Sequence, residues 1–545
     1  MDTRDKLLYA LLLLLAGTLL CYGWKVFWFL TDDAYIAFRY ISNWDLGYGP
    51  VWNPPPFRPV EGYTNFLWIS LLYAAWQLSG IAPPQLANYL SLVFALGALY
   101  IASRILLQLP WTSVLFRHRM ALLALFLLGV TSNRTFLAWS SSGLETAMLS
   151  CFILAWTYAG ICLTPSQRRW PLAISTSATL IYLTRPDGLL FIAATLIALF
   201  LAWRAGHFPI QHLIQALPLL AAPIHLVWRK SFYGEWLPNT YYAKAVAIWP
   251  ESGIRYALSF ALEYALWTWG ALAIYVLWAK RDTLWRFFTV PYSPAKLIPP
   301  LTTLTLLGHA TYYTFVFGGD HFEYRIYVHL VPLVYLSFIW LLNVLESKPK
   351  QALTLLTLSI LLSWPIPWIH WSQTSHLDNR SQTLQLKTPV APHFPTPLRF
   401  YASAFDNLQS WLIDRFVCIR HQEHKTNHRF LANMFPPRSQ GQFLPSTDHP
   451  VFFFPAIGVP AWRLPHINIL DIHGLNDYII ARTPPDPNEQ RMMAHERTPP
   501  TGYIDCFKPN TRLVAPGQIK IFPRKLIAAE ISTCETQWAQ TLTPP

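Results

Sequence analysis

Long apolar stretches recur along the first 370 residues of the chain and are absent afterwards. A helix needs roughly 20 apolar residues to cross the hydrocarbon core of a bilayer, and residues 7–30 already meet that length. A cleaved signal peptide is the alternative for this stretch, but it is long and lacks a small-residue cleavage site. We predict eleven membrane spans, at residues 7–29, 85–108, 120–137, 145–164, 171–185, 188–203, 213–228, 263–279, 297–316, 326–345 and 352–370.

One further apolar stretch, residues 65–80, is shorter and more interrupted than the others. It carries Trp68, Tyr73 and Trp76, and aromatic residues of this kind concentrate at the membrane–water interface. We therefore predict a helix that lies along the membrane surface.

The charged residues between the spans predict an orientation. With the N-terminus in the cytoplasm, every inside connection carries Lys or Arg, in agreement with the positive-inside rule. If residues 65–80 crossed the membrane, every later span would reverse and this agreement would be lost. The net charge of +13 is then explained by loops that orient helices, and we expect no nucleic-acid partner.

Composition agrees with a lipid environment for most of the chain. Only 13% of residues are charged, whereas soluble domains carry about 25%. After residue 370 polar residues and proline become common, so we predict a transmembrane domain at 1–370 and a soluble domain outside the membrane at 371–545. Its expected elements are a helix at 400–413 and strands at 451–456, 467–472 and 518–522, which together indicate a mixed α/β domain.

Three of the six cysteines, Cys418, Cys506 and Cys534, fall in this predicted outer domain. The outside of a cell is oxidising, so we expect one disulfide among these three, and the sequence leaves the pair open. The other three cysteines lie in predicted spans, where a thiol usually acts as a small hydrophobic group.

Two adjacent carboxylates, Asp32 and Asp33, directly follow the first span. Neighbouring carboxylates repel each other, so one of them is expected to hold a proton or to share a cation. A carboxylate at this place can take a proton from an attacking hydroxyl or help to hold a divalent ion against a departing phosphate. The structural alternative is a helix cap with a favourable dipole contact.

Several motifs extend this pattern along the chain. Residues 31–40 read TDDAYIAFRY, residues 60–68 read VEGYTNFLW, and further motifs follow at 184–188, 232–244, 318–321 and 471–482. Together they resemble the GT-C superfamily of polyprenol-phosphate-sugar glycosyltransferases. The closest branch contains the terminal arabinofuranosyltransferases of mycobacterial cell walls and related proteins of Gram-negative bacteria. The resemblance implies an α-helical integral membrane protein of GT-C type with an extracytoplasmic C-terminal domain.

The resemblance also implies roles for acidic residues. In this superfamily the catalytic acid lies in the first outer loop, here residues 31–84, and Asp32 or Asp33 matches that place. Glu145 lies in a later outer turn where a second functional acid often occurs, although a capping or solvated Glu is equally compatible. Glu61 and His321 are candidate ligands for a divalent ion such as Mg, Mn, Ca or Zn.

Basic residues on the same face are candidates for the donor phosphate. Arg185, Lys244 and Arg325 could bind that phosphate and stabilise it as it leaves, and Asn239 could contact the sugar. The alternative for each basic residue is an anchor whose charged end reaches the headgroups.

The function implied is transfer of a sugar, such as the pentose arabinofuranose, from a polyprenyl-phosphate carrier. The acceptor would be an envelope glycan, a glycolipid such as lipopolysaccharide, or a protein, at the outer face of a bacterial inner membrane. A lipid-carrier or solute transporter is an alternative, but it predicts broken helices in repeated halves, and we find no repeat. A non-catalytic envelope assembly protein that presents residues 371–545 is the second alternative.

Overall fold

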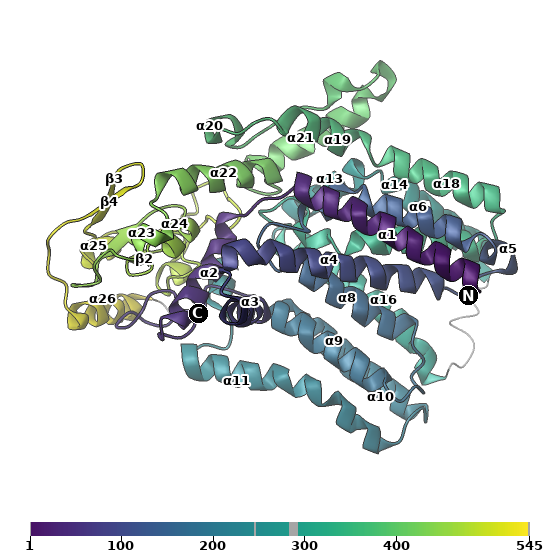
Figure 1. Ribbon diagram of the computed structural model, residues 1–545, viewed down its shortest axis with the longest axis horizontal. Helices are drawn as coiled ribbons and strands as arrows, with labels where there is room; N and C mark the ends of the chain where they lie inside the picture. Colours follow the sequence, from purple (N-terminus) through teal and green to yellow (C-terminus); the bar gives the residue numbers. More distant parts are fainter. Residues whose placement is uncertain (1, 245–246, 283–292, 543–545) are drawn as a thin grey trace.

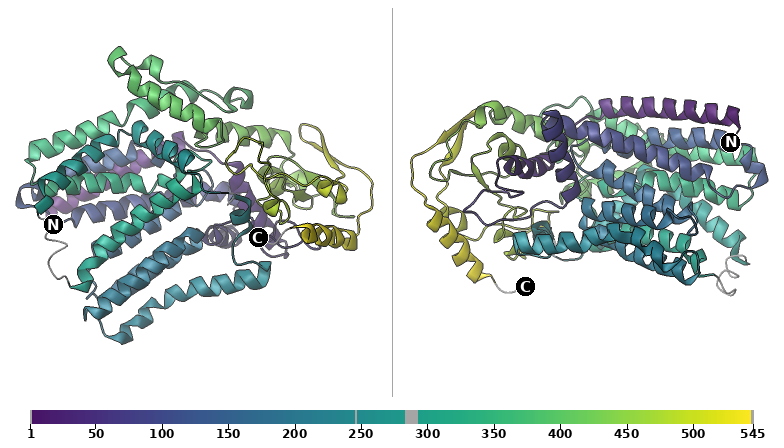
Figure 2. Two further views of the ribbon diagram at one scale, coloured as in Figure 1. Left: turned by 180° about the vertical axis from the view of Figure 1, so that it is seen from behind. Right: turned by 60° about the horizontal axis from the view of Figure 1, so that its bottom comes forward.

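The computed structural model describes all residues except 1, 245–246, 283–292 and 543–545. Figure 1 shows a bundle of helices with a mixed region of helices and strands at one end. The N-terminus lies at the opposite end of the bundle, and the second view of Figure 2 shows the same separation. Residues that directly follow α1 therefore reach the end of the bundle where the C-terminal region packs.

Each predicted span falls on one or more helices of the bundle. They are α1 Thr3–Val26, α4 Pro83–Leu107, α6 Arg119–Thr131, α7 Arg134–Ala138, α8 Thr146–Ile161, α9 Trp170–Thr184, α10 Leu189–Arg204, η2 Ile210–Leu220, α11 Ala221–Tyr233, α14 Trp267–Ala279, α16 Ile298–Thr311, η4 Tyr312–Phe317, α17 Leu330–Val344, α18 Pro349–Leu362 and α19 Pro365–Thr374.

Within the described residues, five helices are long and apolar enough to cross a membrane. A sixth span is possible where α13 (Pro250–Glu263) meets α14 at a bend of 94°. Four shorter apolar helices accompany them, among them α3 (Phe66–Ser79), which forms where a surface helix is predicted. These features fit a helical multi-pass membrane protein, while the count of eleven spans stays a prediction.

The first helix shows how these elements meet lipid. α1 buries Ala16, Leu20 and Gly23, which recur at helical spacing on one face. Its other faces expose leucines, including Leu7 and Leu14. One stripe of α1 thus packs on the bundle, and the rest suits a hydrocarbon solvent.

Two short helices outside the spans carry candidate residues. α2 (Asp32–Asp45) begins at the cap residue Thr31, whose hydroxyl accepts a hydrogen bond from the backbone N of Ala34 at 3.1 Å. α12 (Asn239–Lys244) follows α11 and ends on its lysine. Both helices place charged side chains at the same end of the bundle as the C-terminal region.

The C-terminal region contains helices and two small sheets. Its helices are α20 Arg380–Thr383, α21 Arg399–Ile413, α22 His421–Met434, α23 Arg438–Gly441, α24 Gly458–Arg463, α25 Tyr503–Cys506 and α26 Ala528–Thr541. β1 (Val451–Phe453) pairs in parallel with β2 (Asn468–Leu470), and β3 (Thr511–Ala515) pairs antiparallel with β4 (Gln518–Ile521). The predicted helix at 400–413 and the three predicted strand runs are confirmed.

One hydrophobic core runs across the predicted domain boundary. It joins Phe38 and Trp52 of the first outer loop to Val459, Trp462 and Ile469 of the C-terminal region. The region after residue 370 therefore packs on the first loop, and its independence as a domain stays a prediction.

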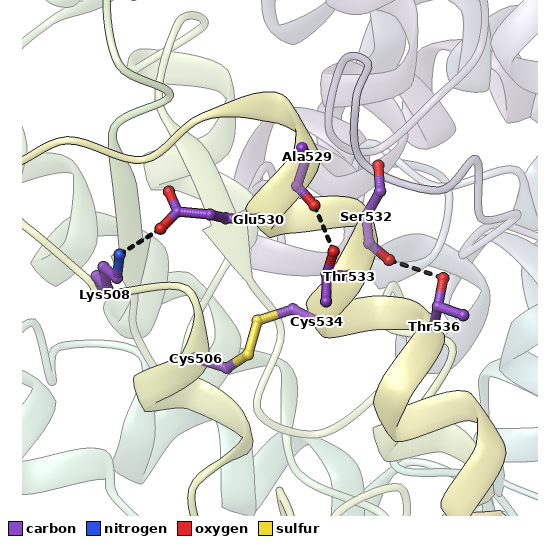
Figure 3. The surroundings of a disulfide bond; sticks show 8 residues. All are labelled: Cys506, Lys508, Ala529, Glu530, Ser532, Thr533, Cys534 and Thr536. Atoms are coloured by element: carbon purple, nitrogen blue, oxygen red, sulfur yellow. Dashed lines mark hydrogen bonds and ion pairs between the residues drawn. A yellow bond between two sulfur atoms is a disulfide. The ribbon is translucent and has the colours of Figure 1, made fainter.

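The predicted disulfide is confirmed, and its partners are Cys506 and Cys534. Figure 3 shows that this disulfide ties α25 to α26. The Cα atoms of the two cysteines are 6.1 Å apart. An ion pair between Lys508 and Glu530, at 2.7 Å, lies beside it. Cys418 keeps a buried free thiol.

Candidate functional site

The carboxylate of Asp32 is hydrogen-bonded to the C-terminal region. Its two carboxylate oxygens accept hydrogen bonds from the backbone N of Gly458 at 3.0 Å and of Val459 at 2.7 Å, at the start of α24. A Cβ on residue 458 would lie 1.9 Å from the carbonyl oxygen of Asp32, so only glycine fits there. Burial raises the pKa of Asp32 to about 7, although the two N–H donors oppose that shift. Both oxygens of Asp32 are thus engaged in holding α24 against α2.

Other residues of the same motif also hold the C-terminal region. Arg39 is fully buried, and burial lowers its pKa to about 9. The Tyr40 hydroxyl lies 2.8 Å from the amide oxygen of Asn476 and accepts a hydrogen bond from the backbone N of Gly62. The guanidinium of Arg39 donates to the carbonyl oxygens of Trp52, Ala461, Leu464, Pro465 and Ile467.

Asp33 differs sharply from its neighbour. Its carboxylate is half-buried, and in the part of the chain that the structure describes it makes no hydrogen bond or ion pair. Its negative charge nevertheless acts on Lys244 and His321, so it faces α12 and the loop after η4. Of the two aspartates, Asp33 is the one whose oxygens remain open to a substrate.

Lys244 is the counterpart of Asp33. It is half-buried at the end of α12, and its ammonium has no hydrogen-bond or ion-pair partner among the described residues. Burial lowers the pKa of Lys244, the charge of Asp33 opposes that shift, and the charges of Arg325 and Arg185 add to it. Arg185 and Arg325, the other two basic residues predicted for the donor phosphate, therefore lie near enough to Lys244 for their charges to act on it.

Arg185 is held rigidly at the end of α9. Its guanidinium contacts Glu145 at 3.1 Å, Asp187 at 3.3 Å and the Tyr313 hydroxyl at 2.7 Å. Asp187 in turn lies 2.7 Å from the ring Nε2 of His309 in α16. This frame fixes the direction in which Arg185 presents its charge.

Arg325 is fixed in a similar way. It makes two parallel hydrogen bonds with Asp320, at 2.8 and 3.1 Å, which is the strong bidentate geometry of arginine. Its charge also acts on Lys244. Arg325 is thus paired with its own acid, whereas the neighbouring Lys244 has no acidic partner within the described part of the chain.

The loop before α8 brings Glu145 to this place. Residues 140–144 pair with the end of the first span, because the backbone N of Thr31 donates to Ser142 and that of Ser142 donates to Phe29, both at 3.1 Å. Gly143 allows the turn with a φ of +78°. Glu145 precedes α8, but its side chain makes no capping hydrogen bond there. Its carboxylate accepts from Asn65 at 2.9 Å and from Arg185 at 3.1 Å instead.

These residues form one charged cluster at the end of the bundle where the C-terminal region packs. We call Asp33, Glu145, Arg185, Lys244, Asp320 and Arg325 the charged cluster. Arg and Lys bind phosphate through charge-assisted hydrogen bonds, and partial burial strengthens such attraction. The cluster can therefore receive a phosphate beside a carboxylate that has free oxygens.

Asn239 has a different environment. Its amide nitrogen lies 2.8–3.1 Å from the carbonyl oxygens of Gly474, Leu475 and Asp477, and its amide oxygen accepts from Arg482 at 2.9 Å. These bonds give Asn239 the role of holding the segment 474–477 of the C-terminal region. The sugar contact predicted for it stays a prediction.

The two metal-ligand candidates have separate partners. Glu61 is buried and ion-paired with Arg229 at 2.5 Å, and burial raises the pKa of Glu61 to about 7 against the effect of that arginine. His321 bonds through Nδ1 to the carbonyl oxygen of Phe416 at 2.8 Å, with His424 and His495 as ring neighbours. The described residues contain no group of three or more His, Cys, Asp or Glu placed to hold a metal ion, so the metal site stays a prediction.

A buried ion network is the main feature that the sequence analysis missed. It consists of Arg134, Glu263, Glu323 and Arg420, whose side chains are at most 2% exposed. Their nitrogen–oxygen distances run from 2.8 to 3.6 Å. The sequence did contain a signal for this network. Arg134 and Glu263 fall in predicted apolar spans, where ionisable residues are costly and need partners.

The chain is similar to two curated arabinofuranosyltransferases, and no family model matches it. It is 27% identical over 340 residues to the terminal β-(1→2)-arabinofuranosyltransferase of Corynebacterium glutamicum, covering 57% of this chain and 47% of that protein. It is 28% identical over 261 residues to the enzyme of the same name from Mycobacterium tuberculosis, covering 45% of this chain and 39% of that protein. The chain thus spans less than half the length of either relative.

Among solved structures, the chain is similar to ArnT from Cupriavidus metallidurans bound to undecaprenyl phosphate. The TM-score is 0.48 at 10% identity, over 86% of each chain. With the two curated relatives, the resemblance to terminal arabinofuranosyltransferases that the motifs indicated is confirmed.

Proposed function

We propose that this protein is a membrane glycosyltransferase that uses a polyprenyl-phosphate sugar as donor. The sugar is a pentose such as arabinofuranose, and the acceptor is an envelope glycan at the outer face of a bacterial inner membrane. The observation that carries the proposal is a pair of half-buried charges inside the charged cluster, Asp33 and Lys244, which have no hydrogen-bond or ion-pair partner among the residues that the structure describes. The names of the two relatives support the choice of sugar.

The negative and the positive side chains of the charged cluster have different roles in the proposed reaction. The acceptor hydroxyl attacks the anomeric carbon of the donor, a new carbon–oxygen bond forms, and the bond from that carbon to the phosphate oxygen breaks. Asp33 takes the hydroxyl proton. Polyprenyl phosphate leaves with one more negative charge than it had in the donor, and Lys244, Arg185 and Arg325 stabilise that charge.

The acids of the cluster other than Asp33, together with Asp187 beside it, act as positioning residues. Glu145 and Asp187 hold Arg185, and Asp320 holds Arg325. Prearranged charges need no reorganisation when charge develops in the reaction. Lys244 is the cation left to bind the incoming phosphate directly.

The partners of Glu61 and His321 do not favour the binding of a divalent ion by these two residues. The carboxylate of Glu61 is already neutralised by Arg229, which leaves a weak ligand for a second cation. The proposed reaction therefore uses no metal ion. Measuring transfer with and without a chelator tests the metal site that the sequence predicts.

Analysis of envelope glycans and lipid carriers by mass spectrometry tests the proposed function. A deletion strain is complemented with wild type, Asp33→Asn, Asp32→Asn and the exposed control Asp378→Asn. The Asp33→Asn strain should lack the transferred sugar and accumulate the polyprenyl-phosphate donor, as the deletion strain does. Normal glycans in Asp33→Asn and in the Asp32/Asp33 double variant would overturn the proposal. Unchanged glycans and carriers in the deletion strain would favour a transporter or an assembly protein instead.

A further inference from the structure

A cavity of about 350 Å³ lies in the C-terminal region, outside the charged cluster. Binding sites for organic ligands typically measure roughly 300–1,000 Å³. The first outer loop supplies one wall, the segment 469–479 a second, and α25 and α26 the others. None of the charged cluster residues lines it.

Aromatic rings make up much of the cavity wall. Trp52, Phe57, Tyr503 and Phe507 line it, and the rings of Phe57 and Phe507 stack with centroids 5.7 Å apart. Each of these four side chains is at most 5% exposed, so the rings form a rigid, buried backing to the cavity and offer a ligand little open surface.

The carboxylate of Glu535 has hydrogen-bond acceptor positions that the described residues leave free. Its two carboxylate oxygens accept from one donor, the backbone N of Arg58, at 3.2 and 3.1 Å. An ionised carboxylate has about four acceptor positions, so a hydroxyl-bearing ligand could occupy the rest. Asp477, the other acid of the lining, is already bonded to two backbone N–H groups and the Tyr503 hydroxyl.

The charge of the cavity favours a neutral ligand. Its arginine, Arg58, lies 3.6 Å over the ring of Tyr478 and is ion-paired with Glu235 at 3.6 Å. A phosphate would meet two carboxylates and a cation that is already shared. A polyhydroxylated neutral molecule meets an open acceptor and is not repelled by the carboxylates.

The cavity wall is braced from two sides. Cys534, next to Glu535, is bonded to Cys506, and Figure 3 shows α26 held beside α25 by this disulfide. On the other side, the segment 474–477 is held by Asn239, the first residue of α12. Because α12 ends at Lys244, this helix connects the wall of the cavity to the charged cluster.

We propose that this cavity binds a neutral oligosaccharide, which is the acceptor glycan, through hydroxyl groups that donate to Glu535. The identification of the ligand as the acceptor rests on the proposed function, whereas the binding of carbohydrate does not. The site would keep a growing glycan at the protein while its end reaches the charged cluster.

Binding of a synthetic linear oligo-arabinofuranoside to the purified full-length protein in detergent tests the proposal. A manno-oligosaccharide of equal length serves as the comparison probe. Glu535→Gln removes the charged acceptor, and Thr536→Trp fills the cavity from the exposed side of α26. Thr533→Trp is the matched control, because Thr533 is exposed on the same helix and does not line the cavity. We expect both cavity variants to weaken oligo-arabinofuranoside binding roughly tenfold or more and the control to bind like wild type.

The outcomes separate this inference from the proposed function. Asp33→Asn should keep full oligosaccharide affinity while losing transfer, and the cavity variants should raise the acceptor KM with kcat and the donor KM unchanged. Loss of binding in Glu535→Gln without any transfer by wild type would support the cavity and overturn the proposed function. Equal binding by wild type, Glu535→Gln and Thr536→Trp, or no binding of either probe by wild type, would overturn the cavity proposal.

Discussion

The charged cluster and the buried ion network use the same residue types in opposite ways. In the network, Arg134, Arg420, Glu263 and Glu323 are nearly inaccessible, and each charge faces an opposite one. In the charged cluster, Asp33 and Lys244 remain half-buried and without partners in the described chain. Buried charges that are all paired with opposite charges indicate a structural role. Two charges without such partners among the described residues, beside arginines held in place, indicate a binding site for a charged ligand.

The largest expected effect is the loss of transfer in Asp33→Asn. An amide cannot take the proton from the acceptor, and removal of a general base costs roughly 10²–10⁴ in rate. Thermal unfolding in detergent should be unchanged, because Asp33 has no partner to lose. Wild-type transfer by this variant would mean that Asp33 belongs with the compensated charges of the network.

Arg420→Met should give the opposite pattern. It removes the contacts of Arg420 with Glu263 and Glu323 and leaves Arg134 as the one arginine of the network that faces both carboxylates. Breaking a buried ion pair costs roughly 3–5 kcal/mol. The unfolding temperature should fall, while transfer per folded molecule should stay near wild type. The double variant Arg420→Met/Glu263→Gln should be more stable than the single one, and equal stability would contradict this account of the network.

Neighbouring residues allow the same comparison within one motif. In Asp32→Asn one of the two backbone N–H groups at α24 loses its acceptor, since an amide offers a single oxygen. Leaving a buried donor unpaired costs roughly 1–3 kcal/mol. The variant should unfold at lower temperature and retain transfer when folded. A variant of normal stability and no transfer would reverse the roles assigned to Asp32 and Asp33.

These two aspartates also show where prediction from sequence ends. The motif identified the loop, but a choice between Asp32 and Asp33 requires the position of Gly458 and Val459, more than 400 residues away in the chain. The apolar helices were predictable because long apolar runs favour helices that can cross a membrane, while the number of spans stays a prediction. The bend between α13 and α14 was not, because it depends on backbone such as that of Ala265, with a φ of +49°, which an apolar sequence does not reveal.

The smallest predicted effect concerns Glu535 and extends the comparison to a third site. Burial raises the pKa of Glu535 to about 7, with Asp477 adding to the shift and Arg58 opposing it. Only about a tenth of the carboxylate is then ionised at pH 6, against about nine tenths at pH 8. The ionised form is the stronger acceptor, so oligosaccharide affinity should increase severalfold between these two pH values.

Titration calorimetry at both pH values measures this change, and Glu535→Gln supplies the control. The variant keeps Asp477, which lines the cavity and whose pKa burial raises to about 6, so its weaker binding should vary less with pH than that of wild type. A pH dependence of the same size in wild type and variant would locate the titrating group elsewhere. A flat wild-type profile would mean that the carboxylate does not meet the ligand, in contrast to Asp33, whose open oxygens are assigned to the reaction itself.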